Sequence, residues 1–81
     1  MTRILMSASE IKDELQKRIN QIQEVIEDGK TVKVLGVKQL AHLDENGCNW
    51  SSDVHFSNSQ GYESDIRRIV ADVQAIANIR T

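Results

Sequence analysis

The dipeptide Asn46-Gly47 constrains this chain most strongly, because it lies between two segments rich in β-forming residues. A two-residue type I′ turn needs positive φ at both central positions, and Asn and Gly adopt positive φ at the lowest cost. The dipeptide therefore predicts a β-hairpin with Asn46 and Gly47 as its loop. This loop fixes a register that pairs Glu45 with Cys48, Leu43 with Trp50, Ala41 with Ser52, Gln39 with Val54, and Val37 with Phe56.

The predicted register separates apolar from polar side chains, which supports the hairpin. One face collects Val37, Leu43, Trp50, Val54 and Phe56. The opposite face pairs Asp44 with Asn49, His42 with Ser51, Leu40 with Asp53, and Lys38 with His55. In the segment Lys30–Leu43, the part Val37–Leu43 could also start a helical turn, and we favour a strand because the hairpin signal follows it. Whether this strand is continuous or broken at Gly36 stays open.

An amphipathic helix is predicted before the hairpin. Ser7 and Glu10 have the spacing of a capping box, and Gly29 is placed as a C-terminal stop. Between them apolar residues recur every three or four positions, which predicts a helix of about five turns. The apolar positions are Ile11, Leu15, Ile19, Ile22 and Ile26.

A second amphipathic helix is predicted after the hairpin, beginning near Gly61 or Tyr62. Its apolar stripe consists of Tyr62, Ile66, Ile69, Val73 and Ile76. The sequence thus predicts an α+β fold of order helix-strand-strand-helix (αββα), with an antiparallel hairpin packed on two amphipathic helices. Residues 1–8 are predicted to be an N-terminal extension and residues 9–81 a single domain.

A lone two-stranded ribbon is barely stable and leaves backbone groups unpaired along both edges. We therefore expect a homodimer, formed either edge to edge or along the second helix. In the second case the dimer residues are Tyr62, Ile66, Ile69, Val73 and Ile76.

The composition argues against several classes of protein. The 81 residues are 40% hydrophobic and 27% charged, with a net charge of −2, so a strongly cationic nucleic-acid footprint is absent. The single Cys excludes an internal disulfide and fits a reducing compartment. No apolar stretch reaches the length of a membrane span. We expect a cytoplasmic protein without a cofactor.

Residues that could carry chemistry are kept apart by the predicted register. Cys48 would need a base such as His42 or His55 to act as a nucleophile, but the register puts both His on the opposite face. His42, Ser51 and Asp53 resemble a triad in type only, since an exposed ribbon offers no enclosed pocket. The two His lie roughly 13 Å apart along the ribbon, too far to share a metal ion. We predict neither a catalytic nor a metal site.

Binding residues are the remaining candidates. Trp50 would be a natural anchor for a partner if it is only partly covered, and otherwise fills the core. The predicted partner surface consists of Trp50, His42, Asp53, Arg67 and Arg68. The alternative is nucleic-acid or nucleotide binding in a groove between protomers, using Arg67, Arg68 and the Lys17–Arg18 pair. Acidic neighbours interrupt both basic clusters, which favours the protein partner.

The motif D-x-x-G-C-N-W, formed by Asp44 to Trp50 and followed by an amphipathic helix, resembles the second half of small bacterial and phage-type proteins. The resemblance brings no activity with it. It implies a setting in which small proteins of mobile elements bind and inhibit, or adapt, a larger complex. We therefore expect a non-enzymatic protein-protein interaction module.

Overall fold

The structure, a computed structural model, describes residues 3–80 of the chain. The helices are α1 (Ala8–Ile19), α2 (Gln23–Asp28) and α3 (Glu63–Ile76), and the strands are β1 (Ile4–Met6), β2 (Lys33–Gly36), β3 (His55–Ser57) and β4 (Ala77–Ile79). The fold is α+β, as predicted. Within residues 3–80, none of the helices is long and apolar enough to cross a membrane.

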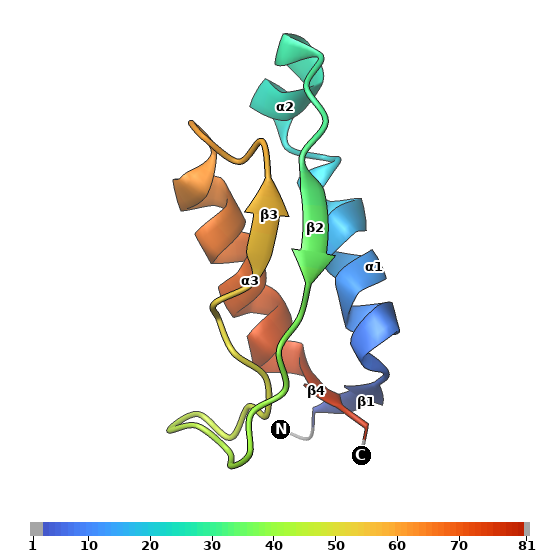
Figure 1. Cartoon of the computed structure of the whole chain (residues 1–81), viewed down its shortest axis with the longest axis vertical. Coiled ribbons are helices and arrows are strands. Elements are labelled where there is room, and N and C mark those ends of the chain that lie inside the picture. The colour runs from blue at the N-terminus through green and yellow to red at the C-terminus, as the bar shows by residue number, and fades with distance from the viewer. Residues whose placement is uncertain (1–2, 81) are drawn as a thin grey trace.

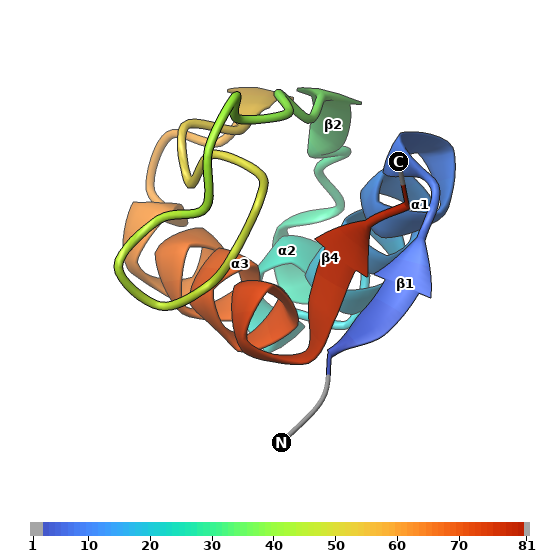
Figure 2. The ribbon, with the colours of Figure 1, turned by 90° about the horizontal axis from the view of Figure 1, so that it is seen from below.

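The elements form two layers (Figure 1). Helices α1 and α3 lie side by side, and the antiparallel ribbon of β2 and β3 covers one side of the pair. A second ribbon, parallel and made of β1 and β4, lies at one end of the molecule, and α2 lies at the other end. Figure 2 shows β1 and β4 next to each other in the view from below.

Trp50 lies at the centre of the core with no exposed surface. Its indole N–H donates a hydrogen bond to the carbonyl of Ala77 at 3.0 Å, which links the segment before β3 to β4. It belongs to one hydrophobic core with buried side chains from both layers, which include Ile11, Leu15, Ile19, Val32, Val34, Ile66, Val70 and Val73. Of the two positions that the sequence left open for Trp50, the structure thus shows the core and not the partner surface.

The first predicted helix begins as expected but is interrupted. Ser7 Oγ accepts the N–H of Glu10 and the Ser7 N–H donates to the Glu10 carboxylate, both at 3.0 Å, so the predicted capping box is confirmed. The chain then leaves the helix after Ile19, because Ile22 adopts an extended backbone with ψ of 123°. After this break Val25 faces the core while Ile26 is 57% exposed, so the prediction of one continuous stripe to Ile26 is wrong.

Helix α2 ends at the predicted stop. Gly29 has φ of 64°, the left-handed conformation that glycine adopts without steric penalty at a helix C-terminus. The preceding residue, Asp28, accepts a hydrogen bond from the Tyr62 hydroxyl at the start of α3. This bond raises the pKa of Tyr62 to about 12 and joins α2 to α3.

The hairpin loop is longer than the predicted two residues. Gly47 donates its N–H to the carbonyl of Asp44 at 3.0 Å, and the Asp44 N–H donates to the carbonyl of Cys48 at 2.9 Å. Gly47 has φ of 82°, whereas Asn46 has no positive φ. The loop therefore spans residues 45–47 with one left-handed residue, a common alternative for hairpins with Gly.

The register also differs from the predicted one, through the longer loop and further irregularity between the loop and β2, so the predicted strand pairs are wrong. Trp50 lies opposite Gln39 and not Leu43, and Phe56 lies opposite Val34 and not Val37. Leu43, predicted in the core, is 65% exposed. Strand β2 ends at Gly36, where the register shifts, so the segment from Lys30 to Leu43 is broken there and not continuous.

The ends of the chain meet in the parallel ribbon. Ile4 pairs with Ala77, Leu5 with Asn78, and Met6 with Ile79. The segment that we predicted as an N-terminal extension, residues 1–8, thus contributes a strand and the N-cap of α1, while its residues 1 and 2 lie outside the described part of the chain. The order of elements is β1, α1, α2, β2, β3, α3 and β4, so the fold is α+β but the predicted four-element αββα arrangement is not confirmed.

We predict that Trp50 and Leu43, paired on one face in the sequence-based register, differ sharply in their contribution to stability. Trp50→Ala should lower the free energy of unfolding by about 3–5 kcal/mol, because it empties a fully buried site. Leu43→Ala should change it by no more than about 0.5 kcal/mol, since that side chain is exposed. Urea denaturation of both variants measures the difference. A Leu43→Ala cost as large as that of a core residue would contradict the observed register.

Candidate functional site

The predicted partner-surface residues are dispersed over the molecule. His42, Asp53, Arg67 and Arg68 are exposed, whereas Trp50 is buried. Asp53 and Arg67 line one groove, between α3 and the segment that contains β3. Arg68 lines a separate hollow together with residues of α1 and α2, and His42 lines neither of these two sites. The structure therefore keeps only Asp53 and Arg67 together.

The predicted dimer residues of α3 face inward. Tyr62, Ile66 and Val73 are at most 5% exposed and belong to the core of their own chain. Ile69 packs against that core, and Ile76 is 39% exposed. This stripe is thus not available on the surface as the seam that we predicted.

Cys48 is buried, and its thiol donates a hydrogen bond to the carbonyl of Trp50 at 3.5 Å. His42 and His55 are both exposed. In the part of the chain that the structure describes, no group of three or more His, Cys, Asp and Glu side chains is arranged to hold a metal ion. The arrangement gives the thiol a role in packing beside Trp50.

Two basic residues of the alternative nucleic-acid site, Arg18 and Arg68, have acidic residues nearby. Arg18 forms an ion pair with Glu14 at 2.8 Å. Arg18 and Arg68 line one hollow of about 270 Å³, but Glu24 and Asp65 line it too. A phosphate group would meet two carboxylates as well as two guanidinium groups there.

The outer edge of β2 is closed by a side chain of α1. The Gln16 amide nitrogen donates to the carbonyl of Val32 at 2.7 Å, and the Val34 N–H donates to the Gln16 amide oxygen at 2.9 Å. An amide side chain carries one acceptor and two donor hydrogens, so it can replace a peptide group of a neighbouring strand. Gln16 thereby satisfies the Val32 carbonyl and the Val34 N–H, which a third strand would otherwise pair.

Side chains also form hydrogen bonds to the edges of the parallel ribbon, with two backbone groups of Ile79 on β4 and with one carbonyl on β1. On β4, the Ile79 N–H donates to the Asn49 amide oxygen at 2.7 Å, and the Asn49 amide nitrogen donates to the Ile79 carbonyl at 2.8 Å. The Trp50 indole satisfies the carbonyl of Ala77 further along this edge. On β1, the Arg80 guanidinium donates to the carbonyl of Leu5 at 3.1 Å.

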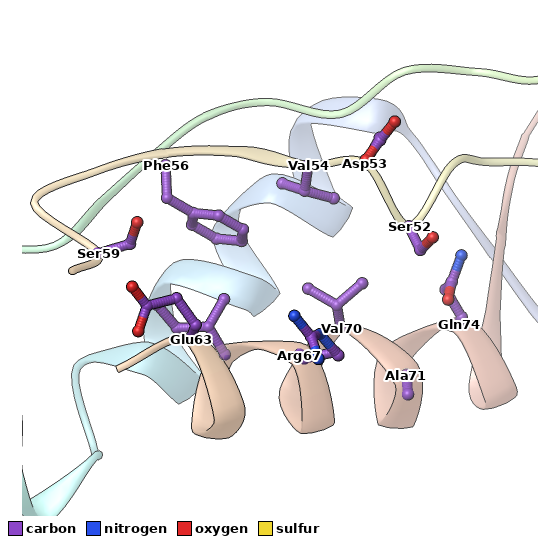
Figure 3. A pocket seen from close by; sticks show the side chains of 11 residues that line it. Ser52, Asp53, Val54, Phe56, Ser59, Glu63, Arg67, Val70, Ala71 and Gln74 are labelled. Carbon is purple, nitrogen blue, oxygen red and sulfur yellow. The ribbon is translucent and has the colours of Figure 1, made fainter. Parts of the chain in front are cut away.

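The outer edge of β3 differs from these three. Strand β3 pairs with β2 alone, and within residues 3–80 no side chain forms a hydrogen bond to the backbone of residues 54–57. A groove of about 350 Å³ runs between this segment and α3 (Figure 3). Its apolar lining consists of Val54, Phe56, Ile66 and Val70. The site is therefore an open strand edge beside an apolar groove.

The rim of the groove carries charges of both signs. Glu63 lies toward the Ser59 end, Arg67 near the middle, and Asp53 near the opposite end, where Ser52 and Gln74 lie (Figure 3). Glu63 and Arg67 are exposed and lie one helical turn apart on α3. This alternation suits a peptide, which has both donors and acceptors, better than a simple anion or cation.

Comparison of the chain with protein-family models, with curated protein sequences and with solved structures finds no match. The function is therefore argued from the geometry of the site.

Sequence reasoning found Asp53 and Arg67 but missed the residues that make the β3 edge distinct. Gln16 and Asn49 set the β3 edge apart because their amides bond to the edges of β2 and β4. In the sequence, each amide residue is next to an apolar residue, Leu15 or Trp50. That adjacency was the available signal, because an amide that is covered beside a core residue needs hydrogen-bond partners.

We predict that Gln16→Ala destabilises the protein by about 1–3 kcal/mol, because it leaves two backbone groups of β2 without a partner. Lys17→Ala, at an exposed neighbouring position of α1, serves as the matched control and should change stability by no more than about 0.5 kcal/mol. Amide hydrogen exchange should show faster exchange at Val34 in the first variant only. Unchanged exchange at Val34 would contradict the role of Gln16.

Asp44 makes the hairpin loop sensitive to pH. Its carboxylate accepts the N–H groups of Cys48 and Asn46, and the bond from Cys48 contributes most to lowering the pKa of Asp44 below its ordinary value of 3.8. Because the folded-state pKa is the lower one, this stabilisation is fully present above the ordinary value and is lost as the pH falls through the folded-state value.

We predict that Asp44→Asn lowers the melting temperature at pH 7 but has less effect at pH 3, since the variant keeps an acceptor oxygen and loses only the charge. The difference between wild type and variant, measured by circular dichroism at each pH, removes the acid sensitivity of other groups. A difference that stays constant from pH 7 to pH 3 would contradict this assignment.

Proposed function

We propose that this protein is a small non-enzymatic protein-interaction module that binds an extended segment of a partner protein along the outer edge of β3. The observation that carries the proposal is the contrast between edges. Side chains form hydrogen bonds to the edges of β2 and β4 and to one carbonyl of β1, whereas within residues 3–80 none bonds to the edge of β3, which lies beside an apolar groove. An open edge of this kind is a template for strand addition.

In strand addition, backbone hydrogen bonds provide affinity and side-chain contacts provide specificity. The backbone of the added segment hydrogen-bonds to residues 54–57, which any sequence can do. Alternate side chains of the added segment point to the same face and reach the groove floor formed by Val54, Phe56, Ile66 and Val70. The bound segment should therefore have apolar residues at every second position.

The charged residues on the groove rim favour particular residue types at the middle and at the ends of the bound segment. Arg67 favours an acidic residue near the middle of the groove, while Glu63 and Asp53 favour basic or amide groups near its ends. The resemblance to small phage-type proteins gives a setting for such binding, in which the module inhibits or adapts a larger complex.

The nucleic-acid alternative gains less support from the geometry. Arg67 and Arg68 line different sites, and the hollow that holds Arg18 and Arg68 also holds two carboxylates. Binding to phosphates would weaken steeply with salt, because counterions are released. Binding along an apolar groove should change little between low and moderate salt.

We predict that peptides selected from a random library on the immobilised protein have apolar residues at alternate positions. Ala71 is exposed on α3 and lines the groove, so Ala71→Arg should fill the groove and weaken peptide binding by about tenfold or more. Ser64→Arg adds the same charge at an exposed position of α3 outside the groove lining, and binding should persist within about twofold. Fluorescence anisotropy measures both affinities.

NMR chemical shifts locate the bound peptide. The proposal expects perturbed amides in residues 52–59 and along the groove side of α3. Selected peptides that perturb another surface, or that bind Ala71→Arg as well as wild type, would overturn it. Affinity that falls steeply with salt would favour the phosphate-binding alternative.

A further inference from the structure

We infer that, without a partner segment, the open edge of β3 is occupied by β3 of a second copy of this chain, so that the protein forms a two-fold symmetric homodimer with a four-stranded antiparallel sheet. This inference rests on the proposed function, because it concerns the same edge and groove. The dimer would hold the binding site closed until a partner segment displaces the second copy.

The choice of edge follows from the backbone. In a symmetric dimer the same patch is used by both copies, so each must offer unpaired backbone groups at that patch. The edges of β2 and β4 are occupied by amide side chains, and Arg80 covers the Leu5 carbonyl on β1. Among the strands of the described chain, β3 is the one whose backbone takes no side-chain hydrogen bond, and antiparallel pairing of β3 with its own copy would satisfy both strands equally.

The charged residues on the groove rim would meet residues of opposite charge in a second copy of the chain. In such a dimer the two-fold axis passes between the two β3 strands at the level of Phe56, the middle residue of β3, and this level lies between Glu63 and Arg67 along α3 (Figure 3). Rotation about this axis brings Arg67 of each copy opposite Glu63 of the other. The interface thus contains this charge pair twice, while the apolar floors of the two grooves face each other.

A charge-exchange experiment tests the inference. Arg67→Glu places acidic residues opposite each other at the interface, and Glu63→Arg places basic residues opposite each other. Each variant alone should dimerise at least about tenfold more weakly than wild type, because two attractive pairs become repulsive. An equimolar mixture of the two variants should form a heterodimer with restored affinity, since every pair then has opposite charges. Sedimentation velocity measures the affinities, and native mass spectrometry distinguishes the heterodimer by its mass.

Thermal denaturation of each variant controls for folding, and Ala71→Arg provides a second disruption that involves neither charge. A wild-type protein that stays monomeric at high concentration overturns the inference. Single variants that dimerise like wild type, or a mixture that does not form the heterodimer, overturn it as well.

Experiments can overturn peptide binding along β3 and homodimer formation independently of each other. A monomeric wild type that binds alternating apolar peptides along β3 retains the proposed function and removes the homodimer. A homodimer that passes the charge-exchange test but binds no selected peptide removes the proposed function as stated and leaves a self-association surface. When both hold, adding peptide should convert dimer to monomer in the sedimentation experiment.

Discussion

A ribbon of two strands leaves one edge of each strand without a strand partner, and the fold of this protein depends on how side chains satisfy those edges. Gln16 and Asn49 each present an amide that donates to a strand carbonyl and accepts from a strand N–H. A buried polar group without a partner costs about 1–3 kcal/mol, a large fraction of the stability of a domain this small. Two short ribbons thus persist without a larger sheet.

The need to satisfy strand edges also explains why the open edge of β3 is notable. Had every strand edge in the described chain been unprotected, β3 would be unremarkable, and general aggregation would be the expected outcome. Because side chains bond to the edges of the other strands, the β3 edge and its groove are where we propose that a partner segment binds. The mixed charges of Glu63 and Arg67 then restrict which strand fits there.

The features that could be predicted from the sequence are those set by neighbouring residues. The capping box of Ser7 and Glu10 and the left-handed stop at Gly29 depend on a few consecutive positions, and both are present. The hairpin register is different, because Asn46-Gly47 fits two loop lengths and Asp44 stabilises the longer one through its own carboxylate. The longer loop and the irregular segment between it and β2 shift the pairing, so that Trp50 lies opposite Gln39 and Leu43 lies on the surface and not in the expected core.

Contacts between distant residues could not be predicted from local patterns. The break before α2 and the pairing of β1 with β4 depend on packing that brings together remote parts of the chain. The candidate site shows the same division. Asp53 and Arg67 were identified as exposed charged residues, but their shared groove depends on the position of β3 over α3, and its significance depends on Gln16, which reaches β2 from another element.

The parallel ribbon also has a consequence for the order of folding. Residues 4–6 emerge from the ribosome well before residues 77–79, so β1 must wait for nearly the whole domain before it can pair. Closing a loop of that length costs chain entropy before any contact repays it, whereas α1 and the hairpin can form from nearby residues. The first strand of this domain to be synthesised is therefore expected to be among the last parts of it to become ordered.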